Sequence, residues 1–395
     1  MVDIAGTLKR GRVPAGFLGM LGIVLLVESF VASRPILFAD VVRLNRRFSV
    51  EAASRFAAGR DVLLLGDSLV KLGLVPGVIG ARSGRSAFNL AAASGPAPST
   101  YFVLRRALES GAKPGAVVVD FGPGLLAAGP ERDVGNSSEV LRLRESLDLA
   151  WTARSVPFLA SFLVRWALPS VRCRNEIRGL VRAAWRGEDY RQAETNRACR
   201  RNWQRNDGAH IAAANPNGGG DDGPPGPDST TPGRLHVHRV NRDYVGRIFA
   251  LAASRGIRVY WLLPPESPRS QASRKRRGVV ESYTKFAGAM QARHPEVTIL
   301  DARRSGYDRS VFFDPVHLDV RGAVALSTSV ADRLVGSVEG PASGPRWVAL
   351  PRPDTMPPGP LPEDLEQSKM ALRAAVESSG TVARVASSPS RTGNR

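Results

Sequence analysis

Five short apolar runs, separated by segments of helical spacing, constrain the fold of this chain more than any other feature. The clearest are residues 61–65 (Asp-Val-Leu-Leu-Leu) and 116–121 (Ala-Val-Val-Val-Asp-Phe), whose continuous apolar character is typical of strands buried on both faces of a parallel sheet. Further strands are expected at 86–90, 256–263 and 297–300. Strands that alternate with helices predict an α/β fold, a doubly wound parallel sheet of five strands.

Apolar residues at helical spacing lie between and after these runs. We expect helices over 99–110, 241–255, 278–293 and 321–335, and a connecting helix over 34–60. In an open sheet of this kind the active crevice lies at the carboxyl ends of the strands. Residues that follow the strands are therefore the first candidates for function.

The N-terminus joins a basic segment, 1–14, to an apolar stretch, 15–33. The part before Glu28 is about the length of a signal-peptide core, and the whole stretch can span a bilayer if the carboxyl of Glu28 is protonated, paired or near an edge. The basic residues favour an uncleaved anchor with a cytoplasmic N-terminus. A cleaved signal or a buried core helix are the alternatives. Both the uncleaved anchor and the cleaved signal place the remaining chain on the extracytoplasmic side.

Three segments interrupt or follow the α/β pattern. Residues 137–205 are Arg-rich and helical in spacing, so we expect a helical insertion whose tryptophans lie in the core or line a groove for a glycan or acyl chain. Residues 206–233 are rich in Asn, Gly, Asp and Pro and are expected to form a disordered loop. The Pro- and Ser-rich residues 337–395 are expected to form a disordered tail, which leaves 61–336 as the domain.

Charge and cysteine content limit the partners. The 395 residues include 55 Lys and Arg against 36 Asp and Glu, a net charge of +19. Such a charge suits nucleic acid, anionic membranes or acidic polymers, but a general arginine bias is the favoured explanation. No nucleic-acid-binding module is recognisable, so no nucleic acid partner is expected. Cys173 and Cys199 exclude a disulfide-dense scaffold, and they can form one disulfide if the chain is exported or remain free thiols.

Two motifs at predicted element ends point to nucleophilic catalysis. The first strand runs into Gly-Asp-Ser68, and Asp314 and His317 stand just before the last helix of the domain. A serine nucleophile needs a positioned base, and an aspartate beside the histidine can orient its ring. A second Asp-x-x-His copy, Asp207 to His210, lies in the polar loop with no strand before it, and we set it aside. The joint placement predicts that Ser68, Asp314 and His317 are catalytic.

These residues carry a family resemblance. The segment 61–68, and Asp314-Pro-Val-His-Leu followed by Arg321-Gly322, resemble the first and last blocks of the SGNH/GDSL hydrolase superfamily, over about residues 60–125 and 235–336. The resemblance implies a flavodoxin-like sheet in a three-layer α/β/α arrangement. It also implies a nucleophile, an orienting acid and a base at the serine, aspartate and histidine named above.

The middle blocks of the family match less well. Asn89-Leu-Ala-Ala-Ala-Ser-Gly95 loosely resembles the second block, which implies that Asn89 and the N–H of Gly95 contribute to substrate or oxyanion binding. The family has an asparagine donor after the third strand, where this chain reads Phe121-Gly-Pro-Gly-Leu. The N–H groups of Ser68, Gly95 or Gly124 are the candidates to replace that donor.

We therefore expect a serine-dependent ester hydrolase or O-acyltransferase that acts through an acyl-enzyme on an acylated small ester or a cell-envelope glycan. The alternative is a non-catalytic envelope protein that uses the fold to bind a surface polymer or a partner. In that case Ser68 and His317 need not meet, and a distance beyond about 5 Å between Ser68 Oγ and the nearest His317 ring nitrogen favours it.

No cofactor or metal is expected. Residues 122–127 fit the pattern Gly-x-Gly-x-x-Ala, but a poor helix follows them and the pyrophosphate of a dinucleotide needs a helix N-terminus. His236 and His238 have no clustered ligands to complete a metal site. The sequence makes no prediction of oligomeric state.

Overall fold

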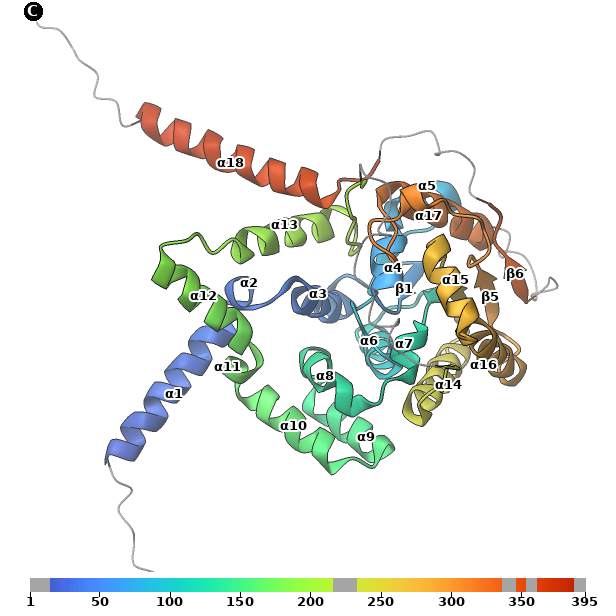
Figure 1. Ribbon diagram of the computed structural model, residues 1–395, viewed down its shortest axis with the longest axis horizontal. Helices are drawn as coiled ribbons and strands as arrows, with labels where there is room; N and C mark the ends of the chain where they lie inside the picture. Colours follow the sequence, from blue (N-terminus) through green and yellow to red (C-terminus); the bar gives the residue numbers. More distant parts are fainter. Residues whose placement is uncertain (1–14, 216–232, 336–345, 353–360, 387–395) are drawn as a thin grey trace, which may run out of the picture.

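The computed structural model describes residues 15–215, 233–335, 346–352 and 361–386 (Figure 1). These residues contain one sheet of six parallel strands in the order β2-β1-β3-β4-β5-β6. The strands are β1 (Val62–Leu65), β2 (Ala87–Asn89), β3 (Ala116–Val119), β4 (Arg258–Leu263), β5 (Thr298–Asp301) and β6 (Trp347–Ala349). The order reverses between β1 and β3, which places the crevice of a doubly wound sheet at the carboxyl ends of these two strands.

Successive side chains of the strands enter two separate cores, as the pleat of a strand requires. Leu63 and Leu65 pack in one core, and Val62 and Leu64 in the other. The first core is covered by α3 (Val41–Arg55), α6 (Ala97–Glu109), α14 (Arg239–Ala253) and α16 (Val279–Arg293), and the second by α4 (Ser68–Gly73), α5 (Pro76–Ser83) and α17 (Val320–Val335). The predicted parallel α/β sheet is confirmed.

The sheet has one strand more than the sequence predicted. β6 pairs with β5 and comes from the segment expected to be a disordered tail, and α18 (Leu365–Ala386) follows it. Trp347 Nε1 donates to Asp301 Oδ2 at 3.2 Å, and Ser305 Oγ donates to the carbonyl oxygen of Leu350 at 2.8 Å. A three-residue edge strand is too short to show an apolar pattern in the sequence. It is therefore recognised only by its pairing with β5. Residues 337–345, 353–360 and 387–395 of the predicted tail lie outside the described residues.

The predicted disordered loop is also wrong over its first part. Residues 206–215 pack against the edge of the sheet, where the N–H of Asn89 donates to the carbonyl oxygen of Asp207 at 2.9 Å. Asn202 Oδ1 accepts the N–H of Ile211 at 2.8 Å. One partner, Asn89, is far away in the chain and the other, Asn202, lies in the preceding helix, and the composition of the segment reveals neither contact. Residues 216–232 lie outside the described residues.

The N-terminal apolar stretch forms one helix, α1 (Ala15–Ser33), that is long and apolar enough to cross a membrane by length and composition. Most of it is exposed, which argues against a buried core helix. Near its end the Glu28 carboxylate accepts the N–H of Ser170 at 2.7 Å, so this carboxyl is paired. The predicted basic segment 1–14 lies outside the described residues.

The predicted connecting helix is two helices, α2 (Pro35–Phe38) and α3. Asp40 separates them and caps α3, because its Oδ1 accepts the N–H of Arg43 at 2.7 Å. Since α3 covers the first core, the packed unit begins before residue 61, where the sequence placed its start.

The insertion is helical, as predicted. Its helices are α8 (Val134–Val140), α9 (Leu143–Ala153), α10 (Val156–Ala167), α11 (Pro169–Arg172), α12 (Arg174–Arg186) and α13 (Gln192–Arg205). Trp203 stacks on Phe48 with ring centroids 4.9 Å apart, but Trp151 and Trp185 are 85% and 90% exposed. The core prediction is therefore wrong for these two, because their helices are covered on one side only. Cys173 and Cys199 are buried free thiols.

Candidate active site

Ser68 is the first residue of α4, the helix that follows β1 (Figure 1). It lies beside the point at which the strand order reverses. Gly66 makes the turn with φ of +125°, and a Cβ there would lie 1.7 Å from Asp120 Oδ1, so only glycine fits. Asp67 caps α4 by accepting the N–H of Leu69 at 2.8 Å. The sequence therefore presents the serine hydroxyl in the first turn of a helix at the carboxyl edge of the sheet.

His317 and Asp314 reach Ser68 from the loop before α17. His317 Nε2 lies 2.8 Å from Ser68 Oγ, and His317 Nδ1 lies 2.6 Å from Asp314 Oδ2. Asp314 Oδ1 also accepts the N–H groups of Val316 and His317. Burial alone would raise the pKa of Asp314, but the hydrogen bonds and charge of His317 and the two N–H groups together lower it. The structure thus brings together the three side chains that the sequence singled out.

The loop that carries the histidine is tied down from two sides. The N–H of Phe313 donates to the carbonyl oxygen of His317 at 2.8 Å. Ser267 Oγ and Ser270 Oγ, at the start of α15 (Pro268–Arg276), both donate to the carbonyl oxygen of Pro315, at 2.7 and 2.8 Å. These bonds fix the loop, and with it the position of the His317 imidazole.

Two buried carboxyl groups, those of Asp67 and Asp120, lie next to Ser68 and connect the ends of β1 and β3 through hydrogen bonds. Asp67 accepts the N–H of Leu69 on Oδ1 and that of Gly122 on Oδ2, while its own N–H donates to Asp120 Oδ1 at 2.9 Å. Asp120 Oδ2 has no hydrogen-bond partner in the described part of the chain. Burial, and then the charge of Asp67, raise the pKa of Asp120 well above its ordinary value. Burial raises the pKa of Asp67 as well, but Asp67 accepts two N–H groups and is therefore the better placed of the two to carry the charge.

Not all of the residues predicted to bind an oxyanion are placed for that role. The side-chain amide of Asn89 is buried and donates to the carbonyl oxygens of Val70 and Leu74, so it supports α4 and does not face a substrate. The N–H of Gly95 donates to the carbonyl oxygen of Ala92 at 2.7 Å. Gly124 lies in the first turn of α7 (Pro123–Ala127), where its N–H has no acceptor within the helix.

Sequence reasoning missed a buried lysine one turn beyond the serine. Lys71 Nζ donates to Ser49 Oγ at 3.1 Å and to the carbonyl oxygen of Gly208 at 2.9 Å. Burial lowers the pKa of Lys71 to about 7. Its position three residues after Ser68 on a helix facing the core is the signal that could have drawn attention to it.

His210, in the second Asp-x-x-His copy, lies close to the same residues. Its N–H donates to the carbonyl oxygen of Lys71 at 3.0 Å, and the side chain is buried. Burial, followed by the charges of Lys71 and His317, lowers the pKa of His210 to about 4. The composition of its segment resembles a loop, so only the packing of 206–215 against α4 reveals this position.

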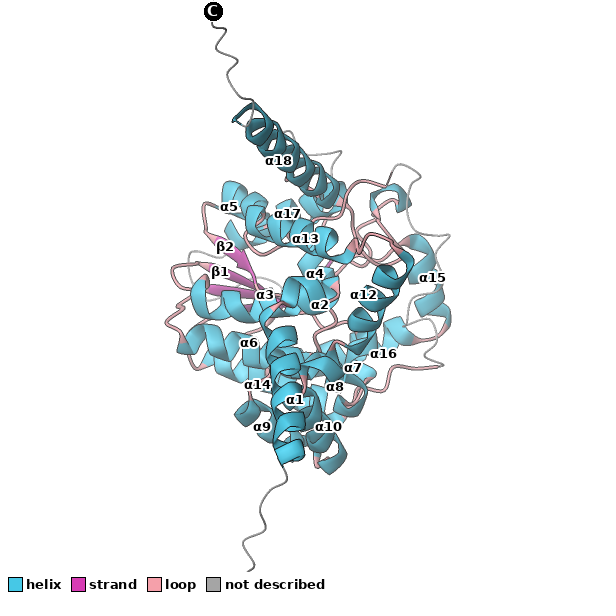
Figure 2. Cartoon of the chain, turned by 90° about the vertical axis from the view of Figure 1, so that its left-hand side faces the viewer, coloured by secondary structure: helices cyan, strands magenta, loops and turns pink. Residues whose placement is uncertain are grey.

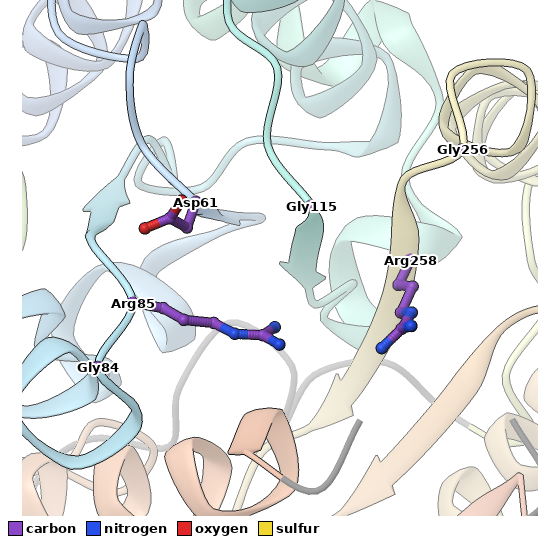
Figure 3. A pocket seen from close by; sticks show the side chains of 6 residues that line it. All are labelled: Asp61, Gly84, Arg85, Gly115, Gly256 and Arg258. Carbon is purple, nitrogen blue, oxygen red and sulfur yellow. The ribbon is translucent and has the colours of Figure 1, made fainter. Parts of the chain in front are cut away.

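Two cavities lie away from these side chains. One, of about 490 Å³, is at the amino ends of β1, β3 and β4, opposite to Ser68, and Arg85 and Arg258 extend into it beside Asp61 (Figure 3). The other, of about 800 Å³, lies between α5, α17 and the segments 205–207 and 361–363. Neither is lined by Ser68, Asp314 or His317.

The geometry defines a Ser–His–Asp arrangement at the carboxyl edge of a doubly wound parallel sheet. No protein-family model matches the chain, and no curated protein matches it.

Proposed function

We propose that this chain is a serine-dependent ester hydrolase or O-acyltransferase of the SGNH/GDSL type. The observation that carries it is the spacing of the three side chains, with Ser68 Oγ 2.8 Å from His317 Nε2 and His317 Nδ1 2.6 Å from Asp314 Oδ2. Both distances lie within the range of about 2.6–3.2 Å that couples a nucleophile, a base and its orienting group. A non-catalytic binding protein has no need of this spacing, so the distances support the catalytic proposal over that alternative.

The reaction divides into two acyl transfers. Ser68 Oγ attacks the carbonyl carbon of an ester while His317 Nε2 takes the hydroxyl proton. When the tetrahedral intermediate collapses, the carbon–oxygen bond to the leaving alcohol breaks and His317 returns the proton to that oxygen, which leaves an acyl-Ser68. Water or a sugar hydroxyl then attacks the acyl carbon by the same steps in reverse. Asp314 keeps the proton on Nδ1 and stabilises the imidazolium that forms.

Backbone N–H groups are the proposed donors to the negatively charged oxygen of the intermediate. Ser68 and Gly124 each lie in the first turn of a helix, and such N–H groups have no acceptor within the helix. Gly95 is less suited, because its N–H already donates to Ala92. One such donor typically supplies about 2.7–4 kcal/mol to the transition state.

The substrate class follows from the proposed place of the enzyme. We propose that α1 anchors the chain in the membrane with the domain on the extracytoplasmic side, where acylated glycans of the cell envelope are accessible. Support comes from the length and apolar character of α1 and from the pairing of Glu28 with Ser170, which ties the end of the helix to the folded domain. Cleavage of a signal after Ser33 would remove this contact.

Hydrolysis of p-nitrophenyl acetate by the full chain tests the reaction. Ser68→Ala should lower kcat by roughly 10⁴- to 10⁶-fold, and a fluorophosphonate should label the natural chain but not the variant. Ser254→Ala, at an exposed helix end, is the matched control and should keep full activity. Full turnover by the Ser68 variant would refute the proposal.

A second measurement separates transfer from hydrolysis. An acetylated donor is supplied together with an unacetylated polysaccharide, and acetate in solution and on the polymer are both quantified. Acetyl groups on the polymer would establish an O-acyltransferase, and free acetate alone would establish an esterase.

A further inference from the structure

The insertion presents an apolar stripe to solvent along α10. The exposed residues Val156, Ala160, Leu163, Val164 and Ala167 recur at the spacing of one helical face. Val156 is 78% exposed, although it is a large apolar residue. The opposite face of the helix packs against the protein, because Phe158 and Phe162 are buried. A stripe of this kind on one surface marks an interaction site better than scattered apolar residues do.

The neighbouring helix α12 adds tryptophan and positive charge. Trp185 projects from its last turn, and Trp166, near the end of α10, is 49% exposed. Four exposed arginines lie along the same helix: Arg174, Arg178, Arg182 and Arg186. Tryptophan is enriched where a protein meets the boundary between lipid headgroups and acyl chains, and arginine near that boundary is attracted to anionic headgroups.

Helices α11 and α12 pack at the base of the apolar helix α1, and α10 leads into α11. α1 packs against α11, which connects α10 to α12. Val31 of α1 is buried with Phe38 and Cys173, and Ile177 and Leu180 of α12 pack against this cluster. In Figure 1, α12, α11 and α10 follow one another along the side of the molecule from which α1 projects, and Figure 2 looks onto that side.

We propose that α10, α11 and α12 form a platform that lies on the anionic phospholipid surface of the membrane that α1 enters. The proposal rests on the membrane location of α1 proposed above. Continuity with α1 selects a lipid surface, because a helix that enters the bilayer brings the helices packed at its base to the headgroup layer. The arginines on α12 complement anionic headgroups. Because α1 packs against α11 and α12, docking also sets the orientation of the domain toward the membrane.

Tryptophan quenching by lipids in vesicles tests the platform with the purified full chain. The vesicles contain phosphatidylglycerol and phosphatidylethanolamine, with a phosphatidylcholine that carries a nitroxide near the headgroup end of its acyl chain. The nitroxide should quench the emission of the natural chain, and the double variant Trp166→Phe/Trp185→Phe should lose most of that quenching. Trp347→Phe, on the edge strand β6, is the control and should leave the quenching unchanged.

The arginines are tested in the same vesicles. Arg178→Ser/Arg182→Ser should reduce the quenching when phosphatidylglycerol is present, and should have little effect in vesicles of phosphatidylcholine alone. Equal loss in both lipids would overturn the electrostatic part of the proposal.

Flotation of the vesicles distinguishes failure of the anchor from failure of the platform. If the chain does not float with the vesicles, the membrane location of α1 is wrong. If it floats but the quenching is the same in the natural chain and in the double tryptophan variant, the anchor holds and the platform is refuted. That second result would exclude a lipid surface as the occupant of the apolar stripe and favour a protein partner.

Discussion

Replacing Asp120 by asparagine tests the arrangement next to Ser68. If Asp120 is protonated in the folded protein, asparagine reproduces its shape and neutral charge, and its amide oxygen can accept the N–H of Asp67 as Oδ1 now does. Asp67→Asn does the opposite. It removes a charge and turns an oxygen that accepts the N–H of Leu69 or Gly122 into an amide nitrogen that donates.

The two substitutions should differ clearly in the free energy of unfolding. Leaving a buried donor without an acceptor costs about 1–3 kcal/mol, and Asp67→Asn leaves one N–H facing another donor. Asp120→Ala removes the acceptor of the Asp67 N–H and should cost a similar amount. Asp120→Asn keeps that hydrogen bond, so we expect a change within about 1 kcal/mol.

Stability should also depend on pH differently in the natural chain and in Asp120→Asn. The pKa of Asp120 is raised in the folded state by burial and by the charge of Asp67. Above the ordinary pKa of aspartate, the folded chain therefore holds a proton that the unfolded chain has released. Relative to the variant, the free energy of unfolding of the natural chain should fall by about 1.4 kcal/mol per pH unit, until the folded Asp120 ionises.

Urea unfolding of the full chain in detergent micelles, followed by circular dichroism between about pH 5 and 7, measures both effects. Activity toward p-nitrophenyl acetate serves as a control for the position of Ser68. If Asp120→Asn proves as destabilising as Asp67→Asn, the proton is not on Asp120. A constant difference between the natural chain and Asp120→Asn across this pH range would refute the reasoning as well.

Three further substitutions probe the same edge of the sheet, with urea unfolding as the measurement. Gly66→Ala should cost about 3 kcal/mol or more, because its Cβ would meet Asp120; a similar loss in Gly59→Ala, which has φ of +75° in open space, would show that the contact is not the cause. In the natural chain, the free energy of unfolding should rise by about 1.4 kcal/mol per pH unit between the folded pKa of Lys71, about 7, and its ordinary value of 10.5. Lys71→Met should remove this rise. Parallel plots of the free energy of unfolding against pH for the variant and the natural chain would contradict the burial of Lys71. Asn89→Asp should cost about 2 kcal/mol or more, because a carboxylate would face two carbonyl oxygens, and an unchanged midpoint would count against that contact.

Three elements, β1, β3 and α1, could be predicted from the sequence. The residues of each one form a recognisable pattern by themselves. A run of four or more apolar residues has to be buried on both faces, and nineteen residues of apolar helix have to lie in lipid or in a core. The positions of Ser68 and His317 follow in the same way. One ends a strand and the other precedes a helix, and the topology of a doubly wound sheet brings such ends to one edge.

Other features depend on residues that are far apart in the chain. Asn89 matched a binding motif, yet its amide supports α4, because its partners at Val70 and Leu74 are set by the pairing of β1 with β2. β6 is defined by its pairing with β5, which the local sequence does not reveal.

The local pattern around a titratable or aromatic side chain does not say what surrounds it in space. His210 stands in a polar segment and is nevertheless buried beside Lys71, while Trp185 stands on an amphipathic helix and is exposed. Apolar spacing tells which face of an element is buried. The sequence by itself determined that much, together with the placement of Ser68 after a strand and of His317 before a helix. Which partners each face meets is decided by long-range packing. Only the tertiary structure therefore placed Asp120 against Asp67, buried Lys71 and left the apolar stripe of α10 exposed.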